Sequence, residues 1–163
     1  MIKTSIQVID NFLPEGKFNQ LQEFLMGPFF PWYYNDQVVK NNDGKFQFVH
    51  TAYKEDVGPS VFYSHFDECQ KLLNVNKIYR IKTNLTTRTS FSQDSVYHID
   101  NLDGAVKTAI FYINTNNGGT RFKNYGKVQS VSNRIVIFNS DIPHCGATCT
   151  NKKRRVVVNF NYE

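Results

Sequence analysis

Four polar residues in the second half of the chain could together bind a metal ion and an anion. His98 and Asp100 are separated by one residue, and in an extended segment such side chains point to the same face, about 6.5–7 Å apart. Both could reach one ion, with His144 arriving from another strand. Two histidines and one carboxylate leave the opposite face of the ion open, as in non-haem Fe(II) oxygenases. Arg154 would add a permanent cation suited to an anionic cosubstrate.

The flanking sequence predicts that these residues lie on strands or at strand ends. His98 and Asp100 close a short β-forming segment, 95–100, while His144 follows the apolar run 134–138 and a polar turn. Arg154 opens a run of β-forming residues that continues to residue 162. Strand ends that converge in a sheet sandwich or barrel could bring all four groups to one site.

Five stretches in the second half of the chain also resemble a known family in order and spacing. The chain is similar to the 2-oxoglutarate- and Fe(II)-dependent dioxygenases, on their prolyl-4-hydroxylase-like side, and looks most like the short single-domain members of phage and marine microbial genomes. The matching stretches are RIKTNL (80–85), YHID (97–100), KTAIFYINTNNGGTRF (107–122), NRIVIFNSDIPHCG (133–146) and RRVVVNFNY (154–162).

The resemblance implies a function and a metal site. His98, Asp100 and His144 would be the Fe(II) ligands and the catalytic centre of a hydroxylase that uses 2-oxoglutarate and O2, with ascorbate left open as an accessory reductant. Prolyl residues of a peptide or protein are the default substrate of this branch, although the scaffold also serves small molecules. Two alternatives stay open: a non-catalytic jelly-roll binding module and a phage structural protein.

The resemblance also implies a set of residues that bind the cosubstrate. Arg154 would pair with the distal carboxylate of 2-oxoglutarate, Tyr112 would donate to the same carboxylate, and Thr108 would share the face of Tyr112. Alternation allows only one of Arg154 and Arg155 to face inward. Arg154 is favoured because it shares its face with Phe160, where the family has an aromatic residue.

One departure from the family affects the same region. Many close relatives have a tyrosine where this chain has Thr86. A contact that relatives make to cosubstrate or substrate through that tyrosine is therefore not expected here.

Composition fits a single domain, residues 1–163, because 40% hydrophobic residues can bury one sizeable core. The net charge of +5 at pH 7 modestly favours anionic partners, but the basic run 152–155 is more typical of a solvated hairpin than of a nucleic-acid site. Neither a membrane span nor a secretory signal is evident. Three cysteines without a full set of pairing partners favour free thiols and a cytoplasmic location, the host cytoplasm if the source is viral.

The pattern along the chain predicts a mainly β fold with flanking helices, an antiparallel double-stranded β-helix (jelly roll). Residues 1–76 would supply helical support and N-terminal strands, and 77–163 the jelly-roll core. We expect an edge strand within 1–10, helices at 14–26 and about 59–73, and a hairpin turn at Gly118 and Gly119 that uses positive φ angles. The expected core strands are 77–85, 96–100, 107–113, 120–122, 134–138 and 156–162.

The segment 29–44 is open to two interpretations. Its first six residues hold five aromatics that could fill the core or line the mouth of the site, and the polar stretch 35–44 is a candidate lid. His50 and His65 have no spacing that links them to the metal-binding pattern and are interpreted as ordinary histidines.

Overall fold

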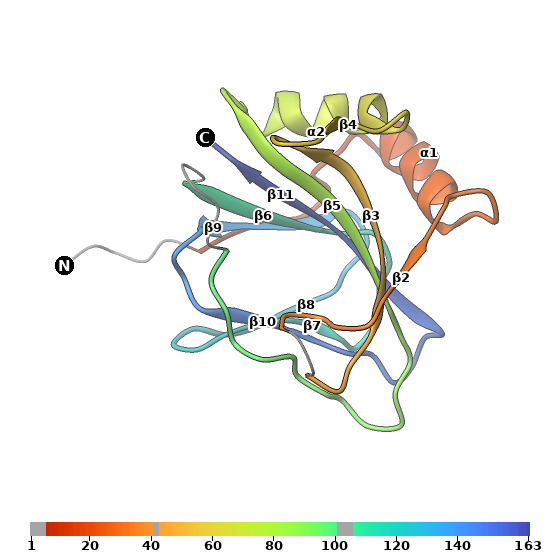
Figure 1. Cartoon of the computed structure of the whole chain (residues 1–163), viewed down its shortest axis with the longest axis vertical. Coiled ribbons are helices and arrows are strands. Elements are labelled where there is room, and N and C mark those ends of the chain that lie inside the picture. The colour runs from red at the N-terminus through yellow and green to blue at the C-terminus, as the bar shows by residue number, and fades with distance from the viewer. Residues whose placement is uncertain (1–5, 41–42, 101–105) are drawn as a thin grey trace.

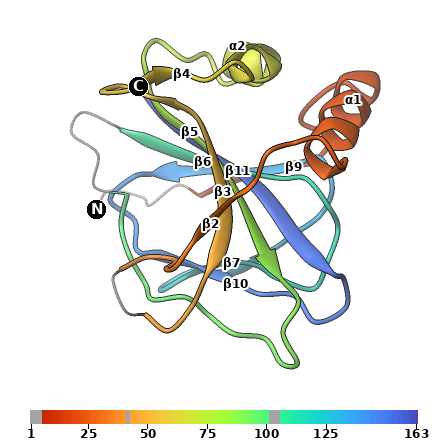
Figure 2. The ribbon, with the colours of Figure 1, turned by 45° about the vertical axis from the view of Figure 1, so that its right-hand side comes forward.

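The structure, a computed structural model, describes residues 6–40, 43–100 and 106–163. Two antiparallel β-sheets face each other and two helices pack on the outside of the larger sheet (Figures 1 and 2). The mainly β, antiparallel architecture predicted from the sequence is confirmed.

The described residues form eleven strands, two α-helices and one 3-10 helix. In chain order they are β1 (Gln7–Ile9), α1 (Glu15–Met26), β2 (Tyr33–Asn35), β3 (Gln47–Lys54), β4 (Gly58–Pro59), the 3-10 helix (Tyr63–Phe66), α2 (Asp67–Leu72), β5 (Ile78–Thr87), β6 (Lys107–Tyr112), β7 (Gly119–Phe122), β8 (Gly126–Gln129), β9 (Arg134–Asn139), β10 (His144–Ala147) and β11 (Arg154–Tyr162).

The larger sheet has the strand order β1-β9-β6-β11-β5-β3-β2, and β4 pairs with β3. Its central strand is β11, which pairs with β6 on one edge and with β5 on the other. Three consecutive valines, Val156, Val157 and Val158, favour the extended backbone because β-branched side chains pack well on a pleated surface. The strand that carries the two candidate arginines is thus held on both edges.

The smaller sheet has the order β10-β7-β8, and an irregular segment runs along the free edge of β10. Antiparallel bridges join Asp94 to Ala147 and His98 to His144. The segment 94–98 therefore extends the smaller sheet and brings the His98–Asp100 pair next to the start of β10.

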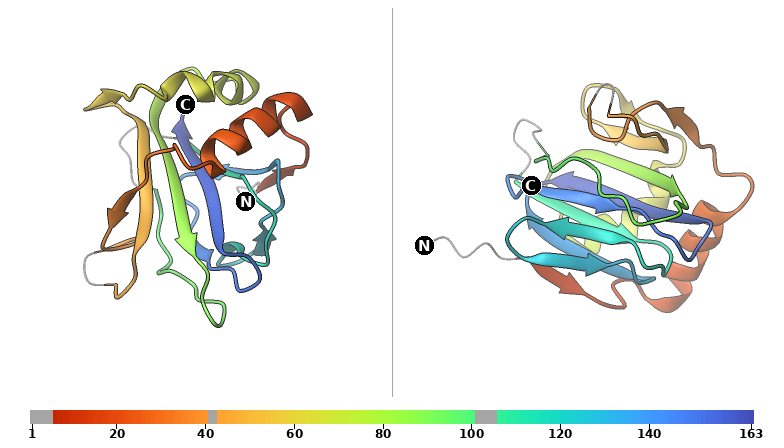
Figure 3. Two further views of the ribbon diagram at one scale, coloured as in Figure 1. Left: turned by 90° about the vertical axis from the view of Figure 1, so that its right-hand side faces the viewer. Right: turned by 90° about the horizontal axis from the view of Figure 1, so that it is seen from below.

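The two sides of the larger sheet differ in what covers them. Its helix-facing side lies under α1 and α2 (Figure 3), where Phe18 packs edge-to-face on Phe111 and Phe66 on Phe160, with ring centroids 5.9 and 6.1 Å apart. Its cavity-facing side looks toward the smaller sheet. Because side chains alternate along a strand, each strand of the sheet contributes to both sides.

The helix predicted at 14–26 is confirmed as α1, and the edge strand predicted within 1–10 is confirmed as β1, although residues 1–5 lie outside the described residues. The second predicted helix, 59–73, is wrong in extent. Gly58–Pro59 pairs with β3, and only the 3-10 turn Tyr63–Phe66 and the short α2 follow it.

Several strands were not expected from the sequence, namely β2, β3, β8 and β10. Conversely, residues 96–100 form a single bridge rather than a strand. β2 and β3 continue the larger sheet beyond β5, so the N-terminal half of the chain supplies part of the sheet that carries the site.

Gly118 and Gly119 serve close packing and not a positive φ angle, which neither adopts. A Cβ added at Gly119 would lie 2.3 Å from the carbonyl oxygen of Val128, and one added at Gly118 would lie 3.0 Å from Cδ of Arg155. The pair therefore lets backbones and the Arg155 side chain approach closely.

Cys69, Cys145 and Cys149 are buried free thiols. Within the part of the chain that the structure describes, no helix has the length and apolar character needed to cross a membrane.

Candidate metal centre and cosubstrate pocket

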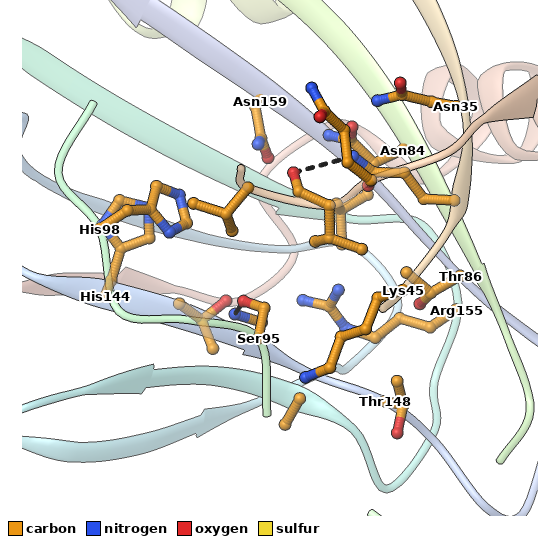
Figure 4. A pocket seen from close by; sticks show the side chains of 18 of the residues that line it. Asn35, Lys45, Asn84, Thr86, Ser95, His98, His144, Thr148, Arg155 and Asn159 are labelled. Carbon is orange, nitrogen blue, oxygen red and sulfur yellow. Dashed lines mark hydrogen bonds between the residues drawn. The ribbon is translucent and has the colours of Figure 1, made fainter. Parts of the chain in front are cut away.

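A cavity of about 640 Å³ lies between the cavity-facing side of the larger sheet and the smaller sheet. Its volume is typical of small-molecule sites. Figure 4 shows His98 and His144 together at one end of the pocket and Arg155 reaching into it from another side. The side chains that matter most below come from β5, the segment 93–100, β10 and β11: Arg80, Lys82, Asn84, Thr86, His98, Asp100, His144, Arg155 and Asn159.

His98 and His144 are brought together by the backbone. The N–H of His98 donates to the carbonyl of His144 at 2.9 Å, and the N–H of His144 donates back at 3.0 Å. Their ring centroids are 4.5 Å apart. The ligand atoms offered by His98, Asp100 and His144 all lie within 4.8 Å of one another. The structure therefore brings together the three residues that the sequence pattern selected.

Each histidine is held with one particular nitrogen toward the site. Nδ1 of His98 lies 3.1 Å from the carbonyl oxygen of Val96, and Nδ1 of His144 lies 3.0 Å from that of Ile142. A carbonyl only accepts hydrogen bonds, so each Nδ1 carries the proton and each Nε2 keeps its lone pair. A metal ligand needs such an outer hydrogen bond to fix its tautomer and ring orientation.

The carboxylate of Asp100 is held by three donors. Oδ2 accepts from the Thr108 hydroxyl at 2.9 Å and from the Asn161 amide at 3.0 Å, and Oδ1 accepts from Nη2 of Arg80 at 3.4 Å. Burial alone would raise the pKa of Asp100, but the charges of Arg80 and His144 and the two hydrogen bonds outweigh it and hold the pKa below its usual value. Asp100 is therefore ionised and oriented for a cation.

His144 is buried among aromatic rings. The Phe138 ring packs edge-on at 4.7 Å between centroids, and that of Phe122 lies at 6.2 Å. Burial lowers the pKa of His144, so its neutral form is favoured. Neutral imidazole is the form that binds metal. Two imidazole nitrogens and one carboxylate form a donor set that fits Fe(II) with open positions.

Arg154 and Arg155 lie on opposite sides of β11. Arg155 is buried, lines the cavity and donates from Nε to the Ser130 hydroxyl at 3.1 Å. Arg154 lies outside this cavity, beside Trp32, and its Nη2 donates to the carbonyl of Met26. The structure thus puts Arg155, and not the Arg154 expected from the sequence, on the side of the candidate metal ligands.

Phe160, the residue whose side of β11 was expected to face inward with Arg154, does not face the cavity. Phe160 is fully buried, but it packs on Phe66 beneath the helices. In this sheet the most apolar side of β11 faces the helices, whereas the side toward the cavity carries polar residues. The two arginines do face opposite sides of β11, as alternation predicts. Phe160, however, faces the helices and therefore does not mark the side that faces the cavity.

Tyr112 and Thr108 lie behind the cavity rather than among its lining residues. The Tyr112 hydroxyl donates to Thr120 at 2.8 Å, and the Arg155 guanidinium lies 5.8 Å from the centre of the Tyr112 ring. Burial raises the pKa of Tyr112. Thr108 instead contacts Asp100, as described above. Tyr112 therefore supports Arg155, and Thr108 supports the candidate metal ligand Asp100.

Sequence reasoning missed the polar stripe on β5. Arg80, Lys82, Asn84 and Thr86 alternate with residues that face away from the cavity, and all four line it. An alternation of polar and apolar residues over 80–86, interrupted only by the polar Thr83, was visible in the sequence and is a signal for one wet face of a strand. It carried no information about which cavity that face would line.

The aromatic segment divides between core and surface. Phe30 is buried in the core, Phe29 is 91% exposed, and no residue of 29–34 lines the cavity. The following stretch does line it, through Asn35 and residues 37–39, while residues 41–42 lie outside the described chain. His50 bonds to Pro31 and Ser60 away from the metal ligands.

In sequence, neither a protein-family model nor a curated protein matches the chain. In structure, the chain has the fold of the 2-oxoglutarate- and Fe(II)-dependent oxygenases, and prolyl hydroxylases recur among its neighbours. The predicted jelly roll is confirmed, as is the resemblance at the level of fold.

Three solved structures illustrate the likeness. A prolyl hydroxylase from Trichoplax adhaerens, in complex with a hypoxia inducible factor oxygen degradation domain peptide fragment, has a TM-score of 0.71 at 14% identity over 98% of this chain and 84% of that one. A prolyl-4-hydroxylase from Pseudomonas putida has a TM-score of 0.67 at 14% identity over 99% and 94%. HygX from Streptomyces hygroscopicus, with nickel and 2-oxoglutarate bound, has a TM-score of 0.63 at 12% identity over 98% and 82%.

Proposed function

We propose that this protein is a Fe(II)- and 2-oxoglutarate-dependent oxygenase that hydroxylates its substrate. The single observation that carries the proposal is the convergence of His98, Asp100 and His144 in one cavity with the buried cation of Arg155. The fold, shared with enzymes of this chemistry, supports it.

Nε2 of His98, Nε2 of His144 and the Asp100 carboxylate would hold the iron. Both histidines keep their Nδ1 atoms engaged with backbone carbonyls, and Asp100 keeps Thr108 and Asn161 as donors. When bound, Fe(II) would supply the activation of O2 that no side chain can provide. The contribution of the protein is to orient three ligands and leave room beside them.

Arg155 would bind the distal carboxylate of 2-oxoglutarate. A guanidinium can hold a carboxylate through two parallel hydrogen bonds, and the only hydrogen-bond partner of its side chain among the described residues is the neutral Ser130 hydroxyl. Tyr112 flanks the guanidinium and Gly118 packs against its side chain, so both fix its position. Arg154 is not suited to this role, because it points away from the cavity.

The default substrate of the proposal is a prolyl residue of a peptide or protein. The support is the recurrence of prolyl hydroxylases among the structures with this fold, one of them with a bound peptide. The segment 93–100 and the stretch 35–39 both contribute lining residues to the cavity that holds the proposed metal ligands.

Anaerobic titration of the metal-free protein with Fe(II) and 2-oxoglutarate tests the proposal. We expect a weak visible charge-transfer absorption only when both are present, and succinate formation after oxygen is admitted. His144→Ala should abolish both signals, whereas the matched variant His65→Ala, away from the cavity, should keep them. Absence of the absorption in folded wild-type protein would overturn the proposal.

A further inference from the structure

Lys82 is a half-buried cation that faces the cavity without a partner. It lies on β5 between Arg80 and Asn84 on the cavity-facing side. Lys54 and Lys77, by contrast, form ion pairs with Asp56 and Glu55. Within residues 6–40, 43–100 and 106–163, no hydrogen bond or ion pair engages the ammonium group of Lys82.

The charges that line the cavity are strongly unbalanced. Among the described lining residues, four side chains are cationic, Lys45, Arg80, Lys82 and Arg155, and Asp100 is the only carboxylate. Arg80 already pairs with Asp100. Fe(II) and the dianion of 2-oxoglutarate would cancel each other, so the cosubstrate pair leaves this excess positive charge in place. Buried charges without compensation are costly, and the imbalance favours a further anion.

An uncharged polar group beside Lys82 also lacks a partner. Asn159 pairs with Lys82 across the β11–β5 ladder, and its Oδ1 is buried without a hydrogen bond in the described structure. Oγ1 of Thr86, which lies two steps farther along β5 opposite Arg155, is in the same state. Both residues line the cavity. Because buried polar groups are nearly always satisfied, unpaired ones that face a cavity indicate a ligand that supplies the partner, and the acceptor Oδ1 of Asn159 requires an N–H or O–H donor of that ligand rather than an acidic oxygen.

The register separates this cluster from Arg155. Asn161 pairs with Arg80, Asn159 with Lys82 and Arg155 with Thr86 along the same two strands. Lys82 and Asn159 are therefore one step, about 7 Å, from the pair that holds Asp100, and two steps, about 13 Å, from Arg155. An anion at Lys82 would lie near the metal ligands and apart from the distal carboxylate of the cosubstrate.

We infer that Lys82 and Asn159 bind a compact acidic group of the substrate, a carboxylate or a phosphate, beside the metal ligands. This inference rests on the proposed function, which it makes narrower: the substrate is an acid, or a peptide with an acidic group next to the target carbon. The ammonium donates to one oxygen of the acid and Nδ2 of Asn159 donates to another, while Oδ1 of Asn159 accepts from an N–H or O–H of the same substrate.

The site can be tested with small probes in protein loaded with Ni(II) and 2-oxoglutarate, which holds the cosubstrate without turnover. Calorimetric titration with sodium acetate, and separately with inorganic phosphate, measures a further anion site and distinguishes a carboxylate from a phosphate preference. We expect one of them to bind with a stoichiometry of one while 2-oxoglutarate stays bound.

Substitutions at Lys82 and Asn159 test whether these residues form the anion site. Lys82→Met should weaken the anion about tenfold or more, while Lys82→Arg, which keeps the charge, should retain most of the binding. Asn159→Ala should weaken it less. Lys71→Met, an exposed lysine on α2, is the matched control and should change nothing. The affinity for 2-oxoglutarate should stay within about twofold in all four variants.

Three results would overturn the inference: no binding of either anion, equal weakening in Lys82→Met and Lys71→Met, or a tenfold loss of 2-oxoglutarate affinity in Lys82→Met, which would make Lys82 a cosubstrate residue. Failure of the proposed function would look different, because wild-type protein would then bind no 2-oxoglutarate. The acetate and phosphate titrations of the metal-free protein would still test the acid site by itself.

Discussion

On the helix-facing side of β11, Val156, Val158 and Phe160 are fully buried, whereas Arg155 and Asn159 face the cavity from the other side of the same strand. The first set removes apolar surface from water and stabilises the fold. In the second set, the charge of Arg155 is removed from water and Oδ1 of Asn159 is buried without a partner in the described structure, which costs stability. One strand thus combines a stabilising side with a side that is organised for ligands.

Removal of a metal ligand from the cavity-facing side should have the largest functional effect. Asp100→Asn keeps the shape of the side chain and removes its charge, so metal binding and turnover should fall below detection. The fold should persist, because Thr108 can still donate to the remaining carbonyl oxygen. Calorimetric Fe(II) titration under anaerobic conditions, with circular dichroism as the folding control, measures both.

Retention of tight iron binding by Asp100→Asn would show that the two histidines suffice. Asp94→Asn is the matched control, because Asp94 belongs to the same segment and pairs with Arg121 on the surface. That variant should bind iron as the wild type does.

On the helix-facing side, Phe160→Ala should cause the largest loss of stability. Phe160 is fully buried and contacts the Phe66 ring, so its removal leaves a cavity and should cost about 3–5 kcal/mol of unfolding free energy. Urea denaturation measures the loss. A cost under about 1 kcal/mol would mean that the helices do not depend on this side of β11.

The candidate metal ligands, which the structure brings together, could be selected from the sequence because they form a local pattern. His98 and Asp100 are two residues apart, and His144 follows a clear strand and turn. The fold class followed from period-two runs and turn residues, which are also local. Long, regular elements such as α1 and β11 were predicted with nearly the right bounds.

What could not be predicted depends on contacts distant in sequence. Whether Arg154 or Arg155 faces the cavity depends on where the helices pack, and the sequence of β11 is rich in β-forming residues on both sides. Lys82 and Asn159 are neighbours only through the β11–β5 register. The short strands β8 and β10 carry too few residues to show a period.

Exchange of each arginine for alanine compares the two sides directly. Arg155→Ala should raise the Kd for 2-oxoglutarate about a hundredfold, because a buried bidentate partner of a carboxylate is lost. Arg154→Ala should leave that Kd within about twofold. Calorimetric titration of the Ni(II)-loaded variants measures both constants, and the reverse ranking would return the role to Arg154.

A smaller effect on stability is expected from Lys82, with the opposite sign to that of Phe160. Burial, aided by the charge of Arg80, lowers the pKa of Lys82 to about 8, from 10.5 for an ordinary lysine. Between those two values the unfolded chain binds more protons than the folded one, so the contribution of Lys82 to stability improves as pH rises from about 8 to 10.5. Below pH 8 the full cost applies, on the order of 3 kcal/mol.

Lys82→Met removes that cost and should be more stable than the wild type at pH 7, but nearly equal to it at pH 10.5. Urea denaturation of both metal-free proteins at the two pH values isolates the effect, because the titration of every other group cancels in the difference. A stability difference that is the same at both pH values would show that the ammonium is not desolvated. If Lys82 binds an acid, saturating anion should stabilise only the wild type and close the gap at pH 7, since a ligand that binds the folded state alone stabilises it.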